Sequence, residues 1–331
     1  MNVQFMPVAE YVFNMQRQLG ATAAAFYVLQ NGRVAHESYS GRHDSDDQSR
    51  CVDAYTQFNV GSIRKSYMAL ALSLLIEQGK IESIDDEVSR YLIGMPSIFR
   101  GVTLRHIITH THGLVEKVGS IVREFPVGEG WTYCNVGIDL LYRIISLLTN
   151  MSLSDYITKT VLEPYSLLET GWRSAPNEHL IYNYYTQDNN WVGPNDSVLG
   201  DQSNLFVSAR DLGKWGHVHL RQGVALDGRQ VLPRSVFERV TSLHTPKTVA
   251  VHEPRNGFIW WLQHSTPLNQ LGEKLPTGSY QLLGITGCAV LVIPYYDVVA
   301  VRMYNQLFNP SDYDYLKDIR TFGNMLNEVL N

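Results

Sequence analysis

Cysteine, clustered positive charge and long apolar runs are all scarce in this chain of 331 residues. Its three cysteines, Cys51, Cys134 and Cys288, have the spacing of neither a disulfide framework nor a zinc ribbon. The formal net charge is −5, and no basic run stands out. Because phosphate binding needs concentrated Lys and Arg, we expect no nucleic-acid partner.

Segments typical of membrane insertion or export are missing as well. The longest apolar run, residues 67–76, is too short to cross a bilayer core of about 30 Å. At the N-terminus, Glu10 precedes the first basic residue, Arg17, so this segment resembles an amphipathic helix more than a signal peptide. We therefore expect a cytoplasmic protein with no membrane partner.

The residues that are present are sufficient for a large core, since 44% of them are hydrophobic. Two strand-like runs flank Asn31-Gly32, which is a strong hairpin signal. The spacing of apolar residues predicts a long helix over 62–78 and further helices over 135–149, 154–162 and 208–222. Strand-like runs then dominate 256–306, and a closing helix is expected over 313–330.

Strands at both ends and helices in the middle predict an α+β fold. We expect one antiparallel sheet, built from the N- and C-terminal segments and flanked by helices, with a mostly helical region inserted. The whole chain, 1–331, is expected to be a single catalytic unit. Within it, about 1–61 and 245–331 would form the region that contains the sheet, and about 62–244 the helical region.

The first candidate site is Ser62 with Lys65, at the start of the predicted helix 62–78. Residues i and i+3 of a helix share a face, so Lys65 can reach Ser62. Serine is a weak nucleophile until a base removes its proton. Lysine can be that base only if its pKa falls well below about 10.4, and the apolar surroundings of this pair favour such a shift.

Two further segments hold polar groups that could complete a site. Tyr133 and Asn135 lie just before the predicted helix 135–149, where a phenol could relay a proton and an amide could hold a substrate carbonyl. Ordinary packing and helix capping would explain the same two residues. Thr286-Gly287 opens an apolar strand, where a glycine lets a substrate lie against the strand edge, although a tight turn would need it too.

In chain order, SIRK (62–65), YCN (133–135) and ITG (285–287) resemble the motifs of the serine β-lactamase and penicillin-binding protein superfamily. The resemblance runs from about residue 20 to the C-terminus. It favours the class C-like branch, which also holds esterases and D-peptidases, and implies a β-lactamase/transpeptidase-like fold. The segments between the motifs that carry this resemblance are TLRHIITHTHGL, SLSDYITKTVLEPYSLLETGW and SNLFVSARDLGKW.

The resemblance also implies roles for individual residues. Ser62 would be the acylated nucleophile, and Lys65 and Tyr133 would together act as general base and then general acid. Asn135 would position the substrate beside the Thr286-Gly287 edge. The backbone N–H groups of Ser62 and Cys288 would form the oxyanion hole, whose donors are typically worth about 10²–10³ in rate each. No cofactor or metal is implied, and the partner would be a small-molecule or peptide acyl substrate.

Two positions depart from the pattern of the superfamily. Ile285 stands where Lys or His usually precedes the Thr/Ser-Gly pair, and isoleucine can neither bind a carboxylate nor pass a proton. We therefore expect an esterase, amidase or D-peptidase with weak or no β-lactamase activity. His112 stands where serine is more common, and the sequence offers no reason for it.

Two other interpretations remain open at this point. The cleft could belong to a non-catalytic binding protein that has lost turnover. A metal hydrolase would instead use His106, His110 and His112, whose first pair has the i, i+4 spacing of helical zinc ligands but lacks the Glu of H-E-x-x-H. A cysteine nucleophile is not indicated, because neither Cys134 nor Cys288 has an obvious adjacent base.

Overall fold

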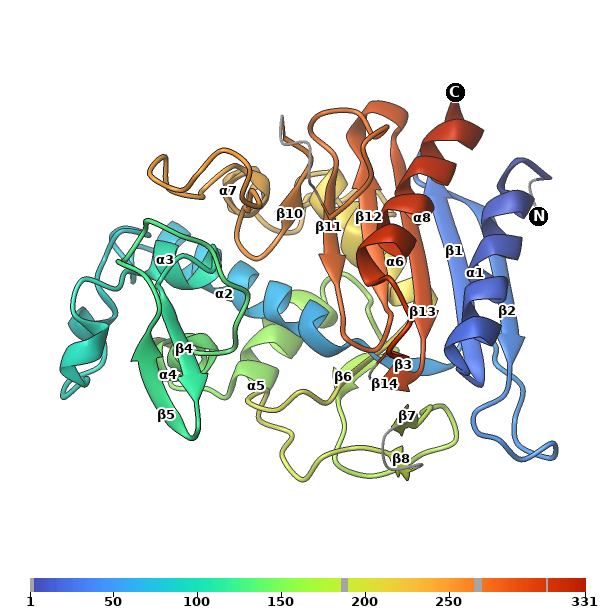
Figure 1. The fold of residues 1–331 in the computed structure, drawn as a ribbon, viewed down its shortest axis with the longest axis horizontal. Coiled ribbons are helices and arrows are strands. Elements are labelled where there is room, and N and C mark those ends of the chain that lie inside the picture. The colour runs from blue at the N-terminus through green and yellow to red at the C-terminus, as the bar shows by residue number, and fades with distance from the viewer. Residues whose placement is uncertain (1–2, 186–189, 265–269, 308) are drawn as a thin grey trace.

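The computed structural model describes residues 3–185, 190–264, 270–307 and 309–331 (Figure 1). The α-helices are α1 (Met6–Leu19), α2 (Lys65–Glu77), α3 (Leu104–Ile108), α4 (Ile138–Thr149), α5 (Leu153–Ile157), α6 (Ala209–Leu220), α7 (Arg234–Thr241) and α8 (Tyr315–Leu330). The strands are β1 (Ala23–Gln30), β2 (Arg33–Gly41), β3 (Gln57–Asn59), β4 (Leu114–Lys117), β5 (Ser120–Arg123), β6 (Thr170–Trp172), β7 (Asn183–Tyr185), β8 (Asn190–Val192), β9 (Leu205–Ser208), β10 (Trp261–Leu262), β11 (Tyr280–Leu283), β12 (Ala289–Ile293), β13 (Val298–Tyr304) and β14 (Gln306–Leu307).

The main sheet joins the two ends of the chain, as the sequence predicts. Within the described ranges it has six strands in the order β10-β11-β12-β13-β1-β2, and every pairing is antiparallel. The early strand β1 lies beside the late strand β13, with Ala24 opposite Tyr304. Asn31 and Gly32 both have positive φ and form the turn between β1 and β2, which confirms the predicted hairpin.

Helices cover both faces of this sheet. In Figure 1, α1 and α8 lie side by side in front of it and α6 lies behind β12, β13 and β1. The sheet strands alternate their side chains between these two layers, so β13 is buried along its whole length. Residues of one core cluster fill the space under α1 and α8, and those of a larger one extend from α6 into the helical region.

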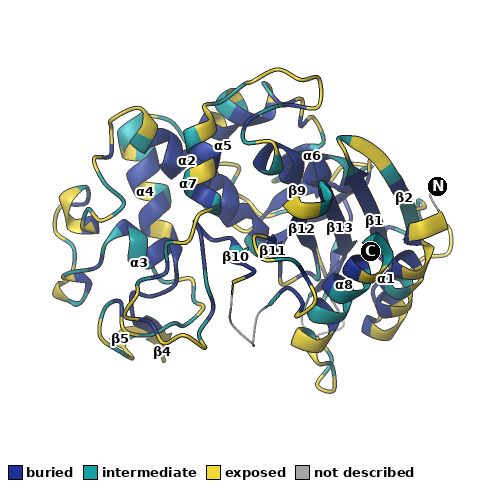
Figure 2. Ribbon diagram, turned by 90° about the horizontal axis from the view of Figure 1, so that it is seen from above, coloured by how far each residue is buried: buried dark blue, intermediate teal, exposed yellow. Residues whose placement is uncertain are grey.

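Helix α2 is the centre of the helical region. Its residues from Lys65 to Leu75 are all buried, and a helix that is apolar on every side is expected in the middle of a core. Helices α4, α5 and α7 pack around it, and the burial colours of Figure 2 show α2 as dark as the central strands. A 3-10 turn, Gly61–Arg64, precedes α2 and lies against β11, so the start of this helix meets the sheet.

Most predicted elements are present, with shifted ends. The predicted helix 62–78 opens as the 3-10 turn before α2, and the helix predicted over 135–149 begins only at Ile138. Helix α6 follows Ser208, whose hydroxyl caps it by accepting from the N–H of Asp211. This helix lies inside the region 62–244 yet packs on the sheet, and the proposed division of the chain at these residues stays a prediction.

In the ranges that the structure describes, no helix combines the length and the apolar character that crossing a membrane requires.

Candidate active site

A cavity of about 500 Å³ lies where the start of α2 meets the sheet. Side chains from both regions and from the C-terminal helix α8 line it. They are Ser62, Arg64, Lys65, Tyr133, Asn135, Ser203, Trp261, Gln270, Leu283, Gly284, Ile285, Asn309, Tyr315 and Leu316. Four of the seven residues predicted for the site, Ser62, Lys65, Tyr133 and Asn135, are among them.

Two glycines allow the turn that carries Ser62 to approach the sheet closely. Gly61 has a φ of +53°, and a Cβ on it would lie 3.1 Å from the backbone nitrogen of Ile285. A Cβ on Gly284 would lie 2.2 Å from the carbonyl oxygen of Val60, which no side chain tolerates. The turn that carries Ser62 and the turn between β11 and β12 therefore form one wall of the cavity.

The amine of Lys65 is the centre of the polar contacts in the cavity. Its Nζ lies 3.2 Å from Oγ of Ser62, 2.6 Å from the phenol oxygen of Tyr133 and 2.7 Å from Oδ1 of Asn135. These groups come from three places in the sequence, and the amine contacts all of them at hydrogen-bonding distance. Lys65 is itself 2% exposed, whereas Ser62 is only half-buried and faces the cavity.

Burial and neighbouring charge together shift the pKa values of Lys65 and Tyr133 in opposite directions. Burial, followed by the neighbouring charge of Arg64, lowers the pKa of Lys65 to about 7. Burial raises the pKa of Tyr133, although a hydrogen bond with Ser62 and the charge of Arg64 act against it. Near neutral pH, about half of the Lys65 amine is therefore unprotonated while Tyr133 is a phenol, so the amine is the stronger candidate for the base.

Aromatic rings hold Tyr133 in place. Its ring is 40% exposed, but it contacts the ring of His110, with the centroids 4.5 Å apart, and stacks on Trp261 at 6.2 Å. His110 is fully buried and has a φ of +58°, because α3 ends before it at Ile108. The helical spacing predicted for His106 and His110 is therefore wrong, since one helix does not carry both.

The remaining histidines near the cavity have structural partners. The Nδ1 atom of His106 caps its own helix by accepting from the N–H of Thr103. In His112, Nδ1 accepts from the N–H of Leu114, which leaves Nε2 3.4 Å from Sγ of Cys134. Within the described part of the chain, no three His, Cys, Asp or Glu side chains form a group that could hold a metal ion.

The contact with His112 corrects the prediction that Cys134 lacks an adjacent base. Burial lowers the pKa of His112 to about 4 and raises the pKa of the Cys134 thiol, so both groups are neutral near pH 7. The thiol donates to the carbonyl of Leu114 at 3.1 Å. His112 and Cys134 thus fix the segment that presents Tyr133, which gives a physical reason for the unusual histidine.

The structure does not bring the other three predicted residues into the cavity as side chains. Thr286 is buried, and its hydroxyl donates to the carbonyl of Asn59 at 2.7 Å. Gly287 has a φ of +84° and packs against the ring of Tyr304. The thiol of Cys288 is buried, with its pKa raised by that burial to about 11. Any contact of this segment with a substrate would therefore use the backbone.

Asn59 connects the three segments that form the wall beside Ser62. Its Oδ1 accepts from the N–H of Gly61, its Nδ2 donates to the carbonyl of Ser203, and its own carbonyl accepts from Thr286. The strand that carries Asn59, β3, pairs with β9. Each of these contacts limits movement of the turn that follows, in which Ser62 lies.

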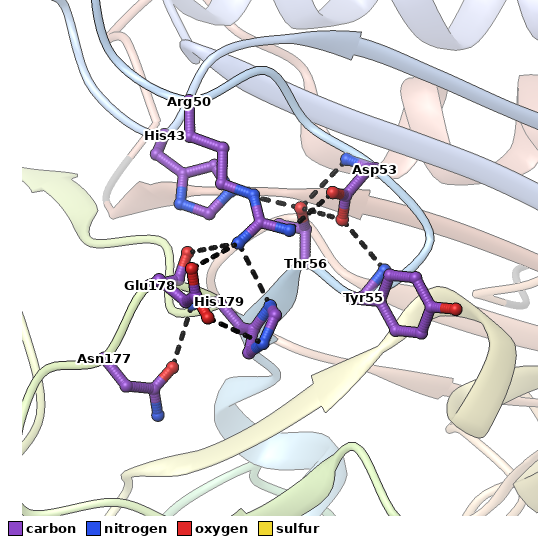
Figure 3. Close-up of polar contacts among 8 residues, drawn as sticks. All are labelled: His43, Arg50, Asp53, Tyr55, Thr56, Asn177, Glu178 and His179. Carbon is purple, nitrogen blue, oxygen red and sulfur yellow. Dashed lines mark hydrogen bonds and ion pairs between the residues drawn. The ribbon is translucent and has the colours of Figure 1, made fainter.

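A polar cluster at the other end of β3 fixes this strand to a distant loop (Figure 3). Arg50 binds the carboxylate of Asp53 at 2.6 Å and donates to the carbonyl of Glu178 at 3.1 Å. Asp53 in turn accepts from the N–H of Tyr55, and its own N–H donates to Thr56 Oγ1. The loop that leads into β3 is therefore fixed both by its own hydrogen bonds and by its contact with Glu178.

Sequence reasoning missed several residues of the cavity. Arg64 was not singled out, although it lies between Ser62 and Lys65 in the SIRK motif. Tyr315 and Leu316 come from the start of α8, far from every motif. Trp261 also lines the cavity, whereas its neighbour Trp260 is fully buried against His219 and Tyr280.

Comparisons with known proteins show the family to which the chain belongs. The family model described as Beta-lactamase matches residues 8–322. An uncharacterized protein of Alkalihalophilus pseudofirmus is 37% identical over 98% of this chain and 96% of its own length. Penicillin-binding protein 4* of Bacillus subtilis is 31% identical over 55% of this chain, which spans 43% of that protein.

Solved structures share the fold at low sequence identity. A class C β-lactamase mutant superposes with a TM-score of 0.77 at 17% identity, covering 99% of both chains. EstCE1, a hydrolase with promiscuous acyltransferase activity, superposes with a TM-score of 0.73 at 18% identity, covering 96% of this chain and 98% of its own. The α+β fold predicted from the sequence is confirmed, and the chain belongs to the Beta-lactamase family of serine hydrolases.

Proposed function

We propose that this protein is a serine hydrolase that acts through an acyl-enzyme on Ser62. Its activity would be that of an esterase, amidase or D-peptidase, with weak or no β-lactamase activity. The observation that carries the proposal is the 3.2 Å contact between the Lys65 amine and the Ser62 hydroxyl. That amine has a pKa of about 7, so a useful fraction of it can accept a proton at neutral pH.

The hydrogen-bonding capacity of Lys65 supports a defined path for the proton. A neutral amine has two N–H donors and one lone pair, and the carbonyl oxygen of Asn135 can only accept, so it takes one N–H. The other N–H and the lone pair serve Ser62 and Tyr133. The Ser62 proton therefore passes to Lys65 directly, or to Tyr133 while the Tyr133 proton passes to Lys65.

Acylation then follows from this arrangement. Oγ of Ser62 attacks the acyl carbonyl, and the carbonyl oxygen becomes an oxyanion that the backbone N–H groups of Ser62 and Cys288 would stabilise. The protonated Lys65–Tyr133 pair returns its proton to the leaving alcohol or amine as the bond to it breaks. In deacylation the same pair removes a proton from water, which attacks the ester of Ser62 and releases the acid.

The lining of the cavity supports the choice of substrate. Trp261, Leu283, Ile285 and Leu316 make much of its wall apolar, and Ile285 is 52% exposed where the superfamily usually has a cation. The carboxylate that most β-lactams carry would find no partner at this position. The neighbour EstCE1 is a hydrolase with acyltransferase activity, which agrees with chemistry on other acyl groups.

A binding protein without turnover is the second candidate function, and Ile285 is the observation that favours it. The intact contacts among Ser62, Lys65, Tyr133 and Asn135 argue for turnover instead. A histidine-based metal hydrolase gains no support, because His106 and His112 are engaged with backbone N–H groups.

Intact-protein mass spectrometry tests the proposal. The protein is incubated with benzylpenicillin and, separately, with p-nitrophenyl acetate, beside Ser62→Ala and a control, Ser45→Ala, whose serine is exposed in a loop. We expect release of p-nitrophenol and a transient acetyl adduct that Ser45→Ala retains and Ser62→Ala loses, with slow or no penicillin turnover. A persistent adduct without turnover would favour the binding protein. Equal ester turnover in Ser62→Ala would contradict the proposal.

A further inference from the structure

Arg64 is a buried cation without a carboxylate partner in the part of the chain that the structure describes. It is 8% exposed and lies two residues after Ser62. Its Nη1 is 3.8 Å from the sulfur of Met68, and its Nε is buried with no hydrogen-bond partner. The carboxylates of Asp139 and Asp201 influence it electrostatically, but neither forms an ion pair with it within 4 Å.

Such an arrangement is costly unless something else binds the guanidinium. Charged side chains are rarely buried without a partner, and an unpaired buried charge typically costs several kcal/mol. Among the described residues, the buried Arg302 pairs with Asp318 and the half-buried Arg239 pairs with Glu77, whereas the half-buried Arg173 has no carboxylate partner. Arg64 differs from them in that it lines the cavity that contains Ser62 and Lys65.

Arg64 also lies in a different place from residue 285, where the superfamily usually has Lys or His and this chain has isoleucine. Ile285 faces Gly61 from the turn between β11 and β12, whereas Arg64 extends along the start of α2 toward Met68. Arg64 and Ser203 both line the cavity, together with Asn135. A charge at Arg64 would therefore select a substrate whose anionic group is placed differently from the carboxylate that residue 285 holds elsewhere in the superfamily.

We infer that Arg64 binds an anionic group of the substrate, so that the preferred substrates are acyl compounds that carry a carboxylate or a similar anion beside an apolar body. This inference rests on the proposed acyl transfer at Ser62. Guanidinium is suited to the task because it offers parallel N–H donors to both oxygens of a carboxylate. The apolar wall formed by Trp261, Leu283 and Leu316 would bind the rest of the molecule.

Two matched pairs of esters test the inference. In the first pair the charge is on the acyl group: p-nitrophenyl 4-carboxybenzoate and its uncharged 4-carbamoyl analogue. In the second it is on the leaving group: 4-acetoxybenzoate and 4-acetoxybenzamide. We expect kcat/KM of the wild-type protein to favour the carboxylate by about 10- to 100-fold in one pair, the factor that a charge-assisted hydrogen bond typically provides. The pair that responds identifies the side of the scissile bond on which the anion lies.

Substitutions at Arg64 then test whether this side chain causes the preference for the carboxylate over the carboxamide. Arg64→Gln should reduce the carboxylate-to-carboxamide ratio to near one, and Arg64→Lys should keep part of it. Arg33→Gln, which removes an exposed arginine of β2, should leave the ratio unchanged and controls for net charge. A wild-type ratio near one in both pairs, or a ratio that survives in Arg64→Gln, would overturn the inference even while Ser62-dependent turnover supports the proposed function.

A binding measurement separates this inference from catalysis. In Ser62→Ala, calorimetry should show at least tenfold tighter binding of the carboxylate than of the carboxamide from the responding pair, or from either pair if neither is turned over. The double variant Ser62→Ala/Arg64→Gln should lose this difference. Equal affinities in Ser62→Ala would overturn the inference, whereas a preserved difference without any turnover would retain the anion site and reject the hydrolase.

Discussion

At Lys65, burial and a neighbouring cation act on one pKa in the same direction. The amine is enclosed by the core of α2, and Arg64 adds a positive charge beside it, so its pKa falls to about 7. The other titratable groups near Lys65 have pKa values well away from 7. Burial lowers the pKa of His110 well below its usual value and that of His112 to about 4, and raises the pKa values of Tyr133 and Cys134.

These pKa values predict how activity depends on pH. Because Lys65 must be unprotonated to act as the base, kcat/KM for a neutral aryl ester should rise with pH through an inflection near 7 and level off above it. Removing the positive charge of Arg64 in Arg64→Gln should move the inflection to higher pH. Steady-state rates from pH 5 to 9 measure both, with Arg33→Gln as the control that keeps the wild-type inflection. A profile that is flat over this range would show that Lys65 is not the base.

At the scale of elements, the turn between β11 and β12 is joined to β3 by the hydroxyl of Thr286. This hydroxyl donates to the carbonyl of Asn59, and both groups are buried. A buried carbonyl that loses its donor typically costs about 1–3 kcal/mol. The contact matters for the site because the side chain of Asn59 also accepts from the N–H of Gly61, the residue before Ser62.

A pair of substitutions at Thr286 separates a structural role from substrate binding. Thr286→Val removes the donor, so we expect the free energy of unfolding to fall by about 1–3 kcal/mol and kcat to decrease, with KM little changed. Thr286→Ser keeps the hydroxyl and should recover most of both. Urea denaturation and ester kinetics provide the measurements. A large rise in KM at unchanged stability would instead assign the hydroxyl to the substrate.

Local sequence patterns predict individual helices and strands, but they do not predict contacts between elements that are remote in sequence. Strand-like apolar runs located the strands of the main sheet, and Ser208 located the start of α6, because apolar runs and caps are local signals. Lys65 was predicted to reach Ser62 for the same local reason. Tyr315 and Leu316 reach the cavity only because α8 packs on the sheet, and no local pattern records that contact. The role of Thr286 was missed because its partner, Asn59, is remote in sequence.

At the scale of the whole molecule, a buried ion pair fixes α8 to the sheet. Arg302 of β13 binds both carboxylate oxygens of Asp318, at 2.8 and 2.7 Å, and Tyr11 of α1 donates to the same carboxylate. Burial opposes ionisation of Asp318, but the charge and hydrogen bonds of Arg302 outweigh it and keep its pKa below the usual value. The stability that Asp318 contributes is therefore present at neutral pH and is lost only when acid protonates it.

Breaking this pair should therefore affect both stability and the cavity. Asp318→Ala leaves Arg302 buried and unpaired, and we expect a loss of about 3–5 kcal/mol in the free energy of unfolding. Activity should also fall as α8, which carries Tyr315 and Leu316, loosens. The double variant Arg302→Met/Asp318→Leu replaces both charges with apolar groups and should be more stable than Asp318→Ala. Chemical denaturation gives the comparison, and a loss below about 1 kcal/mol in Asp318→Ala would contradict this account.

The pairing of β1 with β13 also affects when the candidate site can form during synthesis. Tyr304 is the neighbour of Ala24 in the sheet, but it is translated long after Ala24. The turn between β11 and β12, which packs against Gly61, is also translated long after Ser62 and Lys65, so these two residues emerge before the wall that faces them. During that interval the apolar strand β1 and its neighbour β2 lack the other four described strands of the main sheet, and contacts so distant in sequence form slowly. Until the late strands pair with it, the apolar edge of β1 leaves the growing chain exposed to aggregation.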